Sequence, residues 1–263
     1  MGSLSRNTTN VLFLAAASVA LIFGVLAAIE VPTDLPSGEF RLARARSLLG
    51  LSFLGFPLWA WFKAPESPVR SLAVFGLSFG LLLMGAPAFD SGIARSVMDS
   101  VGILALYAGL AALVHFLLLF PSRPRFFSGQ WAPIVLYAPA VSVALFSIGV
   151  LAVSNPMASR YLGILSIVVS AAYFLSAVGL LFWRYVAAAS PDRTKHGLGI
   201  MCASVLVVVV PLLLYPVLTN VWPDSVRFYQ VIYSTYSPPL TLPLIPIAFS
   251  VAAVRSARSN SIA

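Results

Sequence analysis

His115 is the residue whose type and position most suggest chemistry, because it is the one ionisable side chain well inside a long apolar run. It begins the stretch HFLLLFPSRPR, residues 115–125, where the apolar run gives way abruptly to Arg123 and Arg125. Ionisable groups at membrane depth are costly and mark functional sites by default. A neutral imidazole there can hydrogen-bond to a neighbouring helix, bind a polar ligand or gain a proton as the pH falls. A purely structural contact between helices is the alternative.

Three other residues are candidates for a polar or ligand contact. Tyr107 shares the helical face of His115, and the small residues Ala111 and Ala112 on that face let another helix approach closely. Tyr215 and Asn220 lie in an aromatic-rich region near the ends of the last two apolar runs. An interfacial aromatic belt accounts for this region, and a pocket for an apolar ligand or a peptide is the alternative.

A basic turn after the sixth apolar run supplies the remaining candidates. Such turns ordinarily set the topology of a membrane protein. A contact with anionic lipid or with a cytoplasmic partner is the functional alternative. The residues concerned are Arg184, Arg193, Lys195 and His196.

Enzymatic motifs are missing from the sequence. It contains no P-loop, no GxGxxG and no HExxH, and its Ser, Cys and His residues do not form a recognisable nucleophile and base. The single cysteine, Cys202, excludes an intrachain disulfide and a cysteine metal cluster. We therefore expect no catalytic residue, metal or cofactor. Asp99, just before the fourth apolar run, is expected to cap the start of a helix.

The composition indicates an all-α, polytopic membrane protein. Of 263 residues, 60% are hydrophobic and 9% are charged, whereas soluble domains carry about 25% charged residues. The apolar runs are continuous and of bilayer-spanning length, which excludes the alternating pattern of an outer-membrane barrel. The net charge of +8 is scattered over short loops, so a nucleic-acid partner is not expected.

A single integral membrane domain of about eight spans accounts for residues 1–263. The first run is read as a retained helix, with a cleaved signal as the alternative. Gly76 and Gly80 form a GxxxG pattern in the third run, which permits close helix packing. The second run is preceded by a polar link, residues 30–46, that contains RLARAR. The expected spans are about 11–29, 47–62, 71–89, 101–120, 134–153, 162–183, 198–218 and 239–254.

The basic residues predict the orientation. With eight spans, ten of the 16 Lys and Arg residues fall at the N-terminus, in the second-to-third, fourth-to-fifth and sixth-to-seventh turns, and in the C-terminal tail. The richer side of a membrane protein is cytoplasmic. Both termini are therefore expected in the cytoplasm, and the bacterial cytoplasmic membrane is the expected location.

Three stretches resemble the N-terminal membrane region of bacterial sensor histidine kinases. HFLLLFPSRP at 115–124 is similar to that region's H-F-x-L-x-F-P element, and the basic turn and Pro-containing helix at 184–216 also match it. LPLIPIAFSVAAVR at 242–255 resembles its closing helix, which in the family leads into the kinase. Here the sequence ends eight residues later. The resemblance therefore implies a membrane sensor module without the kinase domain.

The expected function is a stand-alone sensory or regulatory module that signals through a separate cytoplasmic or membrane protein. A small-molecule or lipid transporter is one alternative, motivated by the prolines of the last two spans. A membrane subunit or scaffold of a larger complex is another, because small-residue stripes favour helix association. The lipid bilayer is the expected partner in each case, and a homo-oligomer stays open.

Overall fold

The computed structural model describes isolated positions between 11 and 22 and then residues 37–84, 92–122, 124, 127, 131–153, 156–221 and 241–261. Within these ranges, the structure describes all side chains except those of residues 37–46, 67, 92–95, 151–156, 159, 211–221 and 260–261. The described residues form helices and contain no strand, which confirms the all-α prediction. The helices are α2 (Ser37–Lys63), α3 (Ser67–Met84), α4 (Gly92–Leu119), α5 (Ala132–Val153), α6 (Pro156–Ala187), α7 (Ser190–Lys195), α8 (Leu198–Val221) and α11 (Leu244–Ser261).

Three of these helices are long and apolar enough to cross a membrane: Ser96–Leu119 within α4, Ala132–Val150 within α5 and Arg160–Ala187 within α6. Pro68–Met84 and Leu198–Val210 are shorter apolar helices. Large apolar side chains on α5 and α6 are exposed, among them Val135 and Ile167. A surface of this kind suits lipid, so the chain has the character of a helical membrane protein.

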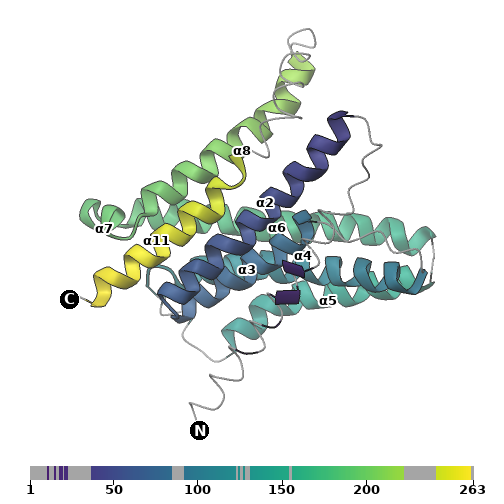
Figure 1. The fold of residues 1–263 in the computed structure, drawn as a ribbon, viewed down its shortest axis with the longest axis horizontal. Helices are drawn as coiled ribbons and strands as arrows, with labels where there is room; N and C mark the ends of the chain where they lie inside the picture. The colour runs from purple at the N-terminus through teal and green to yellow at the C-terminus, as the bar shows by residue number, and fades with distance from the viewer. Residues whose placement is uncertain are drawn as a thin grey trace.

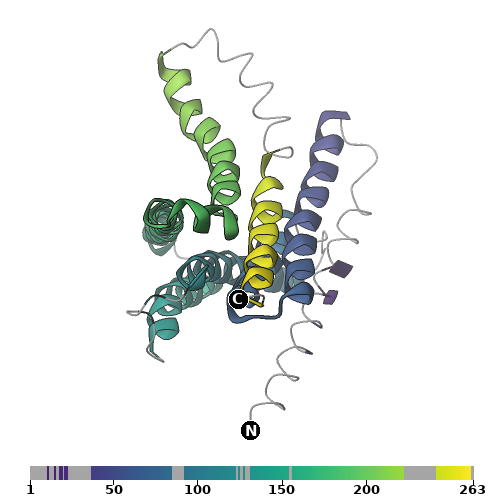
Figure 2. The ribbon, with the colours of Figure 1, turned by 90° about the vertical axis from the view of Figure 1, so that its left-hand side faces the viewer.

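Helices α3 and α4 lie at the centre of the bundle. Helix α3 packs on α2 and α4, and α4 also packs on α5 and α6. The C-terminal helix α11 packs on α2, α3 and α8, which brings the last described helix beside the second (Figure 1; Figure 2). Because α4 packs on α3, α5 and α6, its position affects the placement of three other helices.

Two predicted boundaries were wrong. Helix α2 begins at Ser37, so RLARAR lies in a helix and not in a polar link. Helix α4 begins at Gly92, so Asp99 lies two turns inside the helix and does not cap its start. Both stretches are polar but rich in Ala, Arg, Leu or Met, which favour helix in any environment. Hydropathy alone marks the apolar part of a helix and misses such an extension.

The helix end predicted after His115, at Phe120 and Pro121, is confirmed. Helix α4 ends at Leu119, directly before Phe120 and Pro121. The first predicted span lies almost wholly outside the described residues, as do Arg123 and Arg125. The other predicted spans overlap helices, and the count of eight stays a prediction.

Glycines set the closest helix contacts. A Cβ at Gly76 would overlap the carbonyl oxygen of Phe53 and lie 2.5 Å from Cγ of Pro57 on α2. A Cβ at Gly80 would lie 3.1 Å from the carbonyl oxygen of Gly50, also on α2. The GxxxG pattern of α3 therefore does what the sequence predicts and lets two backbones touch.

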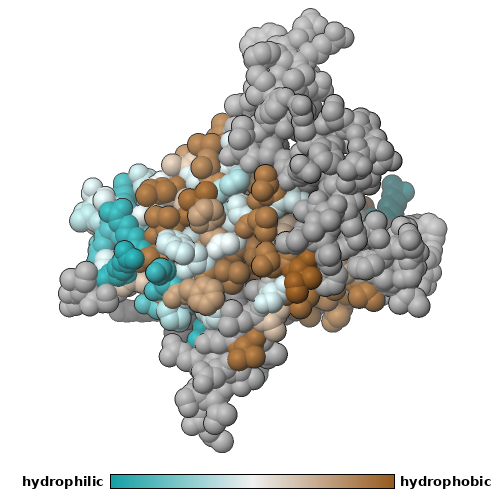
Figure 3. Space-filling model, viewed as in Figure 1, coloured by the Kyte–Doolittle hydropathy of each residue, from teal (hydrophilic) through white to brown (hydrophobic). Residues whose placement is uncertain are grey.

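Polar residues gather at one end of the bundle, which we call the polar end. It comprises the ends of α2, α4, α6 and α11, the starts of α3, α5 and α8, and the short helix α7. Figure 3 shows hydrophilic residues there, on the side where α7 and the C-terminus lie in Figure 1, and mostly apolar residues beside them. Exposed charged residues at this end are Lys63, Glu66, Asp192, Lys195, Arg255 and Arg258.

We expect Gly76→Ala to destabilise the fold, because the added methyl group forces α2 and α3 apart. Overpacking of this kind costs about 1–3 kcal/mol. The chain's single cysteine, Cys202, is buried, so its reaction with a thiol-reactive fluorophore during heating reports unfolding. Gly55→Ala on α2 is the matched control, since a Cβ there meets no atom within 4 Å. Equal melting temperatures for the two variants would contradict the close contact.

Candidate functional site

His115 joins three helices at the polar end. Its Nδ1 lies 3.3 Å from the hydroxyl oxygen of Ser71, at the start of α3, and 3.3 Å from that of Tyr137, near the start of α5. One neutral ring nitrogen either accepts from a hydroxyl or donates to one, so the tautomer decides the direction of these bonds. The half-buried histidine thus makes the contact between helices that the sequence left as one of its alternatives.

Aromatic rings enclose the imidazole of His115. The ring of Tyr137 meets it edge-on at 5.7 Å between centroids, and that of Phe127 does so at 5.6 Å. Phe127 is buried and belongs to the connection between α4 and α5. We call His115, Ser71, Tyr137 and Phe127 the histidine cluster. It contains hydroxyls and a ring nitrogen but no carboxylate, so it is suited to exchanging hydrogen bonds.

Arg184 closes the end of α4. Its Nη2 donates to the carbonyl oxygens of Leu118, at 2.9 Å, and Ser122, at 3.0 Å. The last carbonyls of a helix have no partner within the helix, and a guanidinium can supply donors in a fixed geometry. Arg184 lies in the last turn of α6, so this contact ties the ends of two helices together.

Arg193 serves the end of α6 in the same way. Its Nε donates to the carbonyl of Ala188 at 2.9 Å, and its Nη2 donates to that of Val186 at 3.2 Å. The guanidinium also lies over the ring of Tyr185, 4.7 Å from its centroid. These bonds fold the turn containing α7 back on α6. Lys195, in contrast, is exposed.

His196 connects this turn to α11. Its Nδ1 lies 2.8 Å from the hydroxyl oxygen of Ser256. The next residue, Gly197, has φ +68°, and a Cβ there would lie 3.1 Å from that of Ala252 on α11. A left-handed backbone in close contact with a second helix is a position that glycine fills best. Burial lowers the pKa of His196, and neighbouring Lys195 lowers it further against the opposing effect of Asp192.

A cavity of about 390 Å³ lies among these groups. Arg184, Asp192 and His196 line it, together with Trp183 and the residues that follow α4. The cavity brings two of the four residues predicted for a partner or lipid contact to one place. Arg193 and Lys195 do not line the cavity: Arg193 bonds to the end of α6, and Lys195 is exposed.

The other predicted contacts are placed as follows. Tyr107 is buried on α4, two turns before His115 and about 12 Å from it along the helix axis, so it is not part of the histidine cluster. Tyr215 and Asn220 lie on α8 beyond the described side chains. Among the described residues, no three of His, Cys, Asp or Glu gather as metal ligands.

Sequence reasoning missed the partners of both histidines. Ser71, Tyr137 and Ser256 are ordinary hydroxyl residues 44, 22 and 60 positions away from the histidines they contact. One signal was present: Ser71 and Tyr137 lie within the first two turns of α3 and α5, which begin at the end of the bundle where α4 ends. Without knowledge of how the helices pack, this signal does not show which hydroxyl residues contact His115.

Comparison of the chain with protein-family models, with curated proteins and with solved structures finds no match. The case for function therefore rests on the sequence and on the contacts described above.

We expect Arg184→Gln to destabilise the protein, because the end of α4 loses a charged donor to two carbonyls. Hydrogen bonds to charged groups contribute about 1.5–3 kcal/mol. Because this guanidinium is partly exposed, we expect the free energy of unfolding to fall by about 1–2 kcal/mol. Thermal unfolding followed at Cys202 measures it. Arg160→Gln, at the other end of α6 and exposed, is the matched control. An equal effect of both substitutions would mean that the contact with α4 adds nothing.

We expect acid to weaken the contact between His196 and α11. A histidine whose pKa is lowered in the folded state takes up a proton more readily when unfolded, so its stabilisation is complete above about pH 6.5 and declines as the pH falls. The melting temperature of wild type, followed by circular dichroism, should fall between pH 7.5 and 5.5. In His196→Gln the fall should be smaller by about 1–3 °C. Identical pH profiles would exclude a contribution from His196.

Proposed function

We propose that the chain is a sensory module of the bacterial cytoplasmic membrane. A stimulus within the membrane changes the packing of α4 against its neighbours, and a separate protein reads the change at the polar end, which faces the cytoplasm. The excess of Lys and Arg in the segments at this end supports the orientation. The resemblance of residues 115–124, 184–216 and 242–255 to the membrane region of sensor histidine kinases supports the class of function.

The end of α4 carries the proposal. Within the four residues from His115 to Leu118 it contacts four other helices: the His115 side chain meets α3 and α5, Phe116 packs on α11, and the carbonyl of Leu118 accepts from α6. Phe116 and Phe249 are both buried, with ring centroids 5.9 Å apart. A shift of this segment therefore alters several helix contacts at once. Sensors need such an element with more than one arrangement.

Helix α11 is the element suited to pass the change on. It contacts α4 through Phe249, and it contacts the basic turn through Ser256 and Ala252. Its sequence resembles the helix that precedes the output domain in the kinase family. Exposed charges follow on α11 itself, at Arg255 and Arg258, and Lys195 is exposed on the basic turn. A partner at the polar end would meet these groups.

We expect a photo-crosslinking amino acid at position 195 to capture a specific protein in cells. Lys195 is exposed and, unlike Arg184 and Arg193, is not engaged with a helix end. The control is the same amino acid at Tyr161, which is 65% exposed near the opposite end of α6. Capture at 195 and not at 161 is the expected result. Capture of nothing at 195, or of the same proteins at both positions, would contradict the proposal.

The histidine cluster should control that capture. His115→Ala removes the imidazole shared by α3 and α5, and we expect the yield of the crosslink at position 195 to change at least threefold. Thermal unfolding followed at Cys202 shows whether the variant remains folded. If the folded variant gives an unchanged crosslink yield, the histidine cluster does not take part in signalling.

A further inference from the structure

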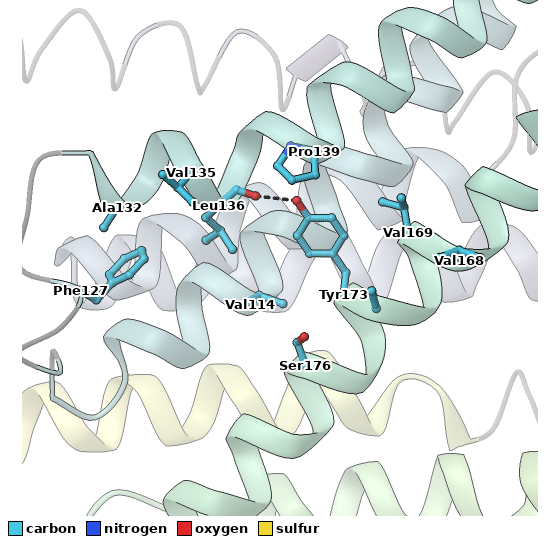
Figure 4. A pocket seen from close by; sticks show the side chains of 11 residues that line it. Val114, Phe127, Ala132, Val135, Leu136, Pro139, Val168, Val169, Tyr173 and Ser176 are labelled. Atoms are coloured by element: carbon cyan, nitrogen blue, oxygen red, sulfur yellow. Dashed lines mark hydrogen bonds between the residues drawn. The ribbon is translucent and has the colours of Figure 1, made fainter.

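A groove of about 560 Å³ lies between α4, α5 and α6. Figure 4 shows its wall: Val114 on α4, residues from Ala132 to Pro139 on α5, residues from Val168 to Ser176 on α6, and Phe127 at one end. The stretch from Ala132 to Pro139 covers about 10 Å of helix. The groove therefore runs from the polar end into the apolar part of the bundle.

Pro139 and Tyr173 explain why the groove stays open. Pro139 has no N–H, so the turn of α5 before it lacks one hydrogen bond of the helix. Tyr173 reaches across from α6 and donates its hydroxyl to the carbonyl of Leu136, 2.5 Å away (Figure 4). Leu136 follows Val135, whose carbonyl is the one that Pro139 leaves without a helical donor, so the tyrosine bonds to the backbone beside this gap. The tyrosine holds α5 and α6 at a fixed separation, and the groove lies beside it.

The lining selects the chemistry of an occupant. It contains no charged residue, and its polar side chains are the hydroxyls of Tyr173 and Ser176. The Tyr173 hydroxyl already donates to Leu136. An ion or a strongly polar molecule would lose its hydration without gaining partners here, whereas a hydrocarbon chain loses nothing.

The mouth of the groove opens onto the face that lipid covers. Val135 and Val168 belong to the lining and are 71% and 58% exposed. Both lie within helices long and apolar enough to span a bilayer. The medium outside the mouth is therefore the acyl chains of the membrane, which supply the occupant directly.

We propose that this groove binds one acyl chain of a membrane phospholipid. The chain lies between α5 and α6 beside Tyr173, and its headgroup remains toward the polar end, near Ala132. The volume lies within the range of about 300–1,000 Å³ that is usual for small-molecule sites lined mainly by apolar groups.

The occupant would act on the histidine cluster through Phe127. This ring lines the groove and also meets the imidazole of His115 edge-on. Val114, next to His115 in the chain, lines the groove as well. As a role in sensing, this coupling rests on the function proposed above and names a lipid chain as the stimulus; the binding itself does not depend on that function.

Native mass spectrometry of the full chain tests the binding. The protein is extracted from membranes containing phosphatidylethanolamine and sprayed from detergent without added lipid. Ala172→Phe places a ring in the groove, and Ala171→Phe is the matched control, since Ala171 is also exposed on α6 but does not line the groove. We expect wild type and Ala171→Phe to retain one phospholipid. In Ala172→Phe, the fraction of protein that carries a phospholipid should be at least fivefold lower.

Two results would overturn the site: a wild type that retains no phospholipid, and equal retention by the two phenylalanine variants. Thermal unfolding followed at Cys202 shows whether both variants are folded. If Ala172→Phe does not fold, Val168→Trp at the mouth of the groove is the second variant that blocks it. Lipid retention combined with no capture at position 195 would contradict signalling but not the site. Capture at 195 with no retained lipid would contradict the site alone.

Discussion

The constraint on which this structure depends is the hydrogen bonding of backbone groups at the end of α4. Helix-terminal carbonyls that lie away from water must find donors elsewhere, because leaving them unpaired is costly. Arg184 of α6 donates to the carbonyl of the buried Leu118 and also to that of the exposed Ser122. That bond fixes where α4 ends relative to α6. His115 and Phe116, one turn earlier, are thereby held against α3, α5 and α11.

Most of the helical framework follows from the sequence, for identifiable reasons. Long apolar runs must form helices in lipid, Phe120 and Pro121 end α4 as predicted, and Gly76 permits the contact between α2 and α3 that the GxxxG pattern implies. The starts of α2 and α4 were not predictable from hydropathy, since Arg, Ala and Leu continue a helix regardless of polarity. Their extent depends on helix propensity and on the packing of neighbours.

The sequence predicted the central residue of the candidate site but not the residues that contact it. His115 is identifiable because a histidine in an apolar run is rare. Its partners are hydroxyl residues on other helices, and only the folded arrangement selects Ser71 and Tyr137 from many similar residues. The basic turn shows the reverse case. Charge alone predicted a role in topology for Arg184 and Arg193, with a lipid or partner contact as the alternative, yet both guanidiniums donate to carbonyls at helix ends.

The same segment of α4 also connects the groove to the last helix over a short distance. Val114 lines the groove, His115 bonds to α3 and α5, and Phe116 packs on Phe249 of α11. These three consecutive side chains point in different directions because successive helical residues are about 100° apart. A rotation of this turn that accommodates an occupant at Val114 must therefore move Phe116 against Phe249. No long chain of intermediates is needed, since a single rigid turn contacts both the groove and the last helix.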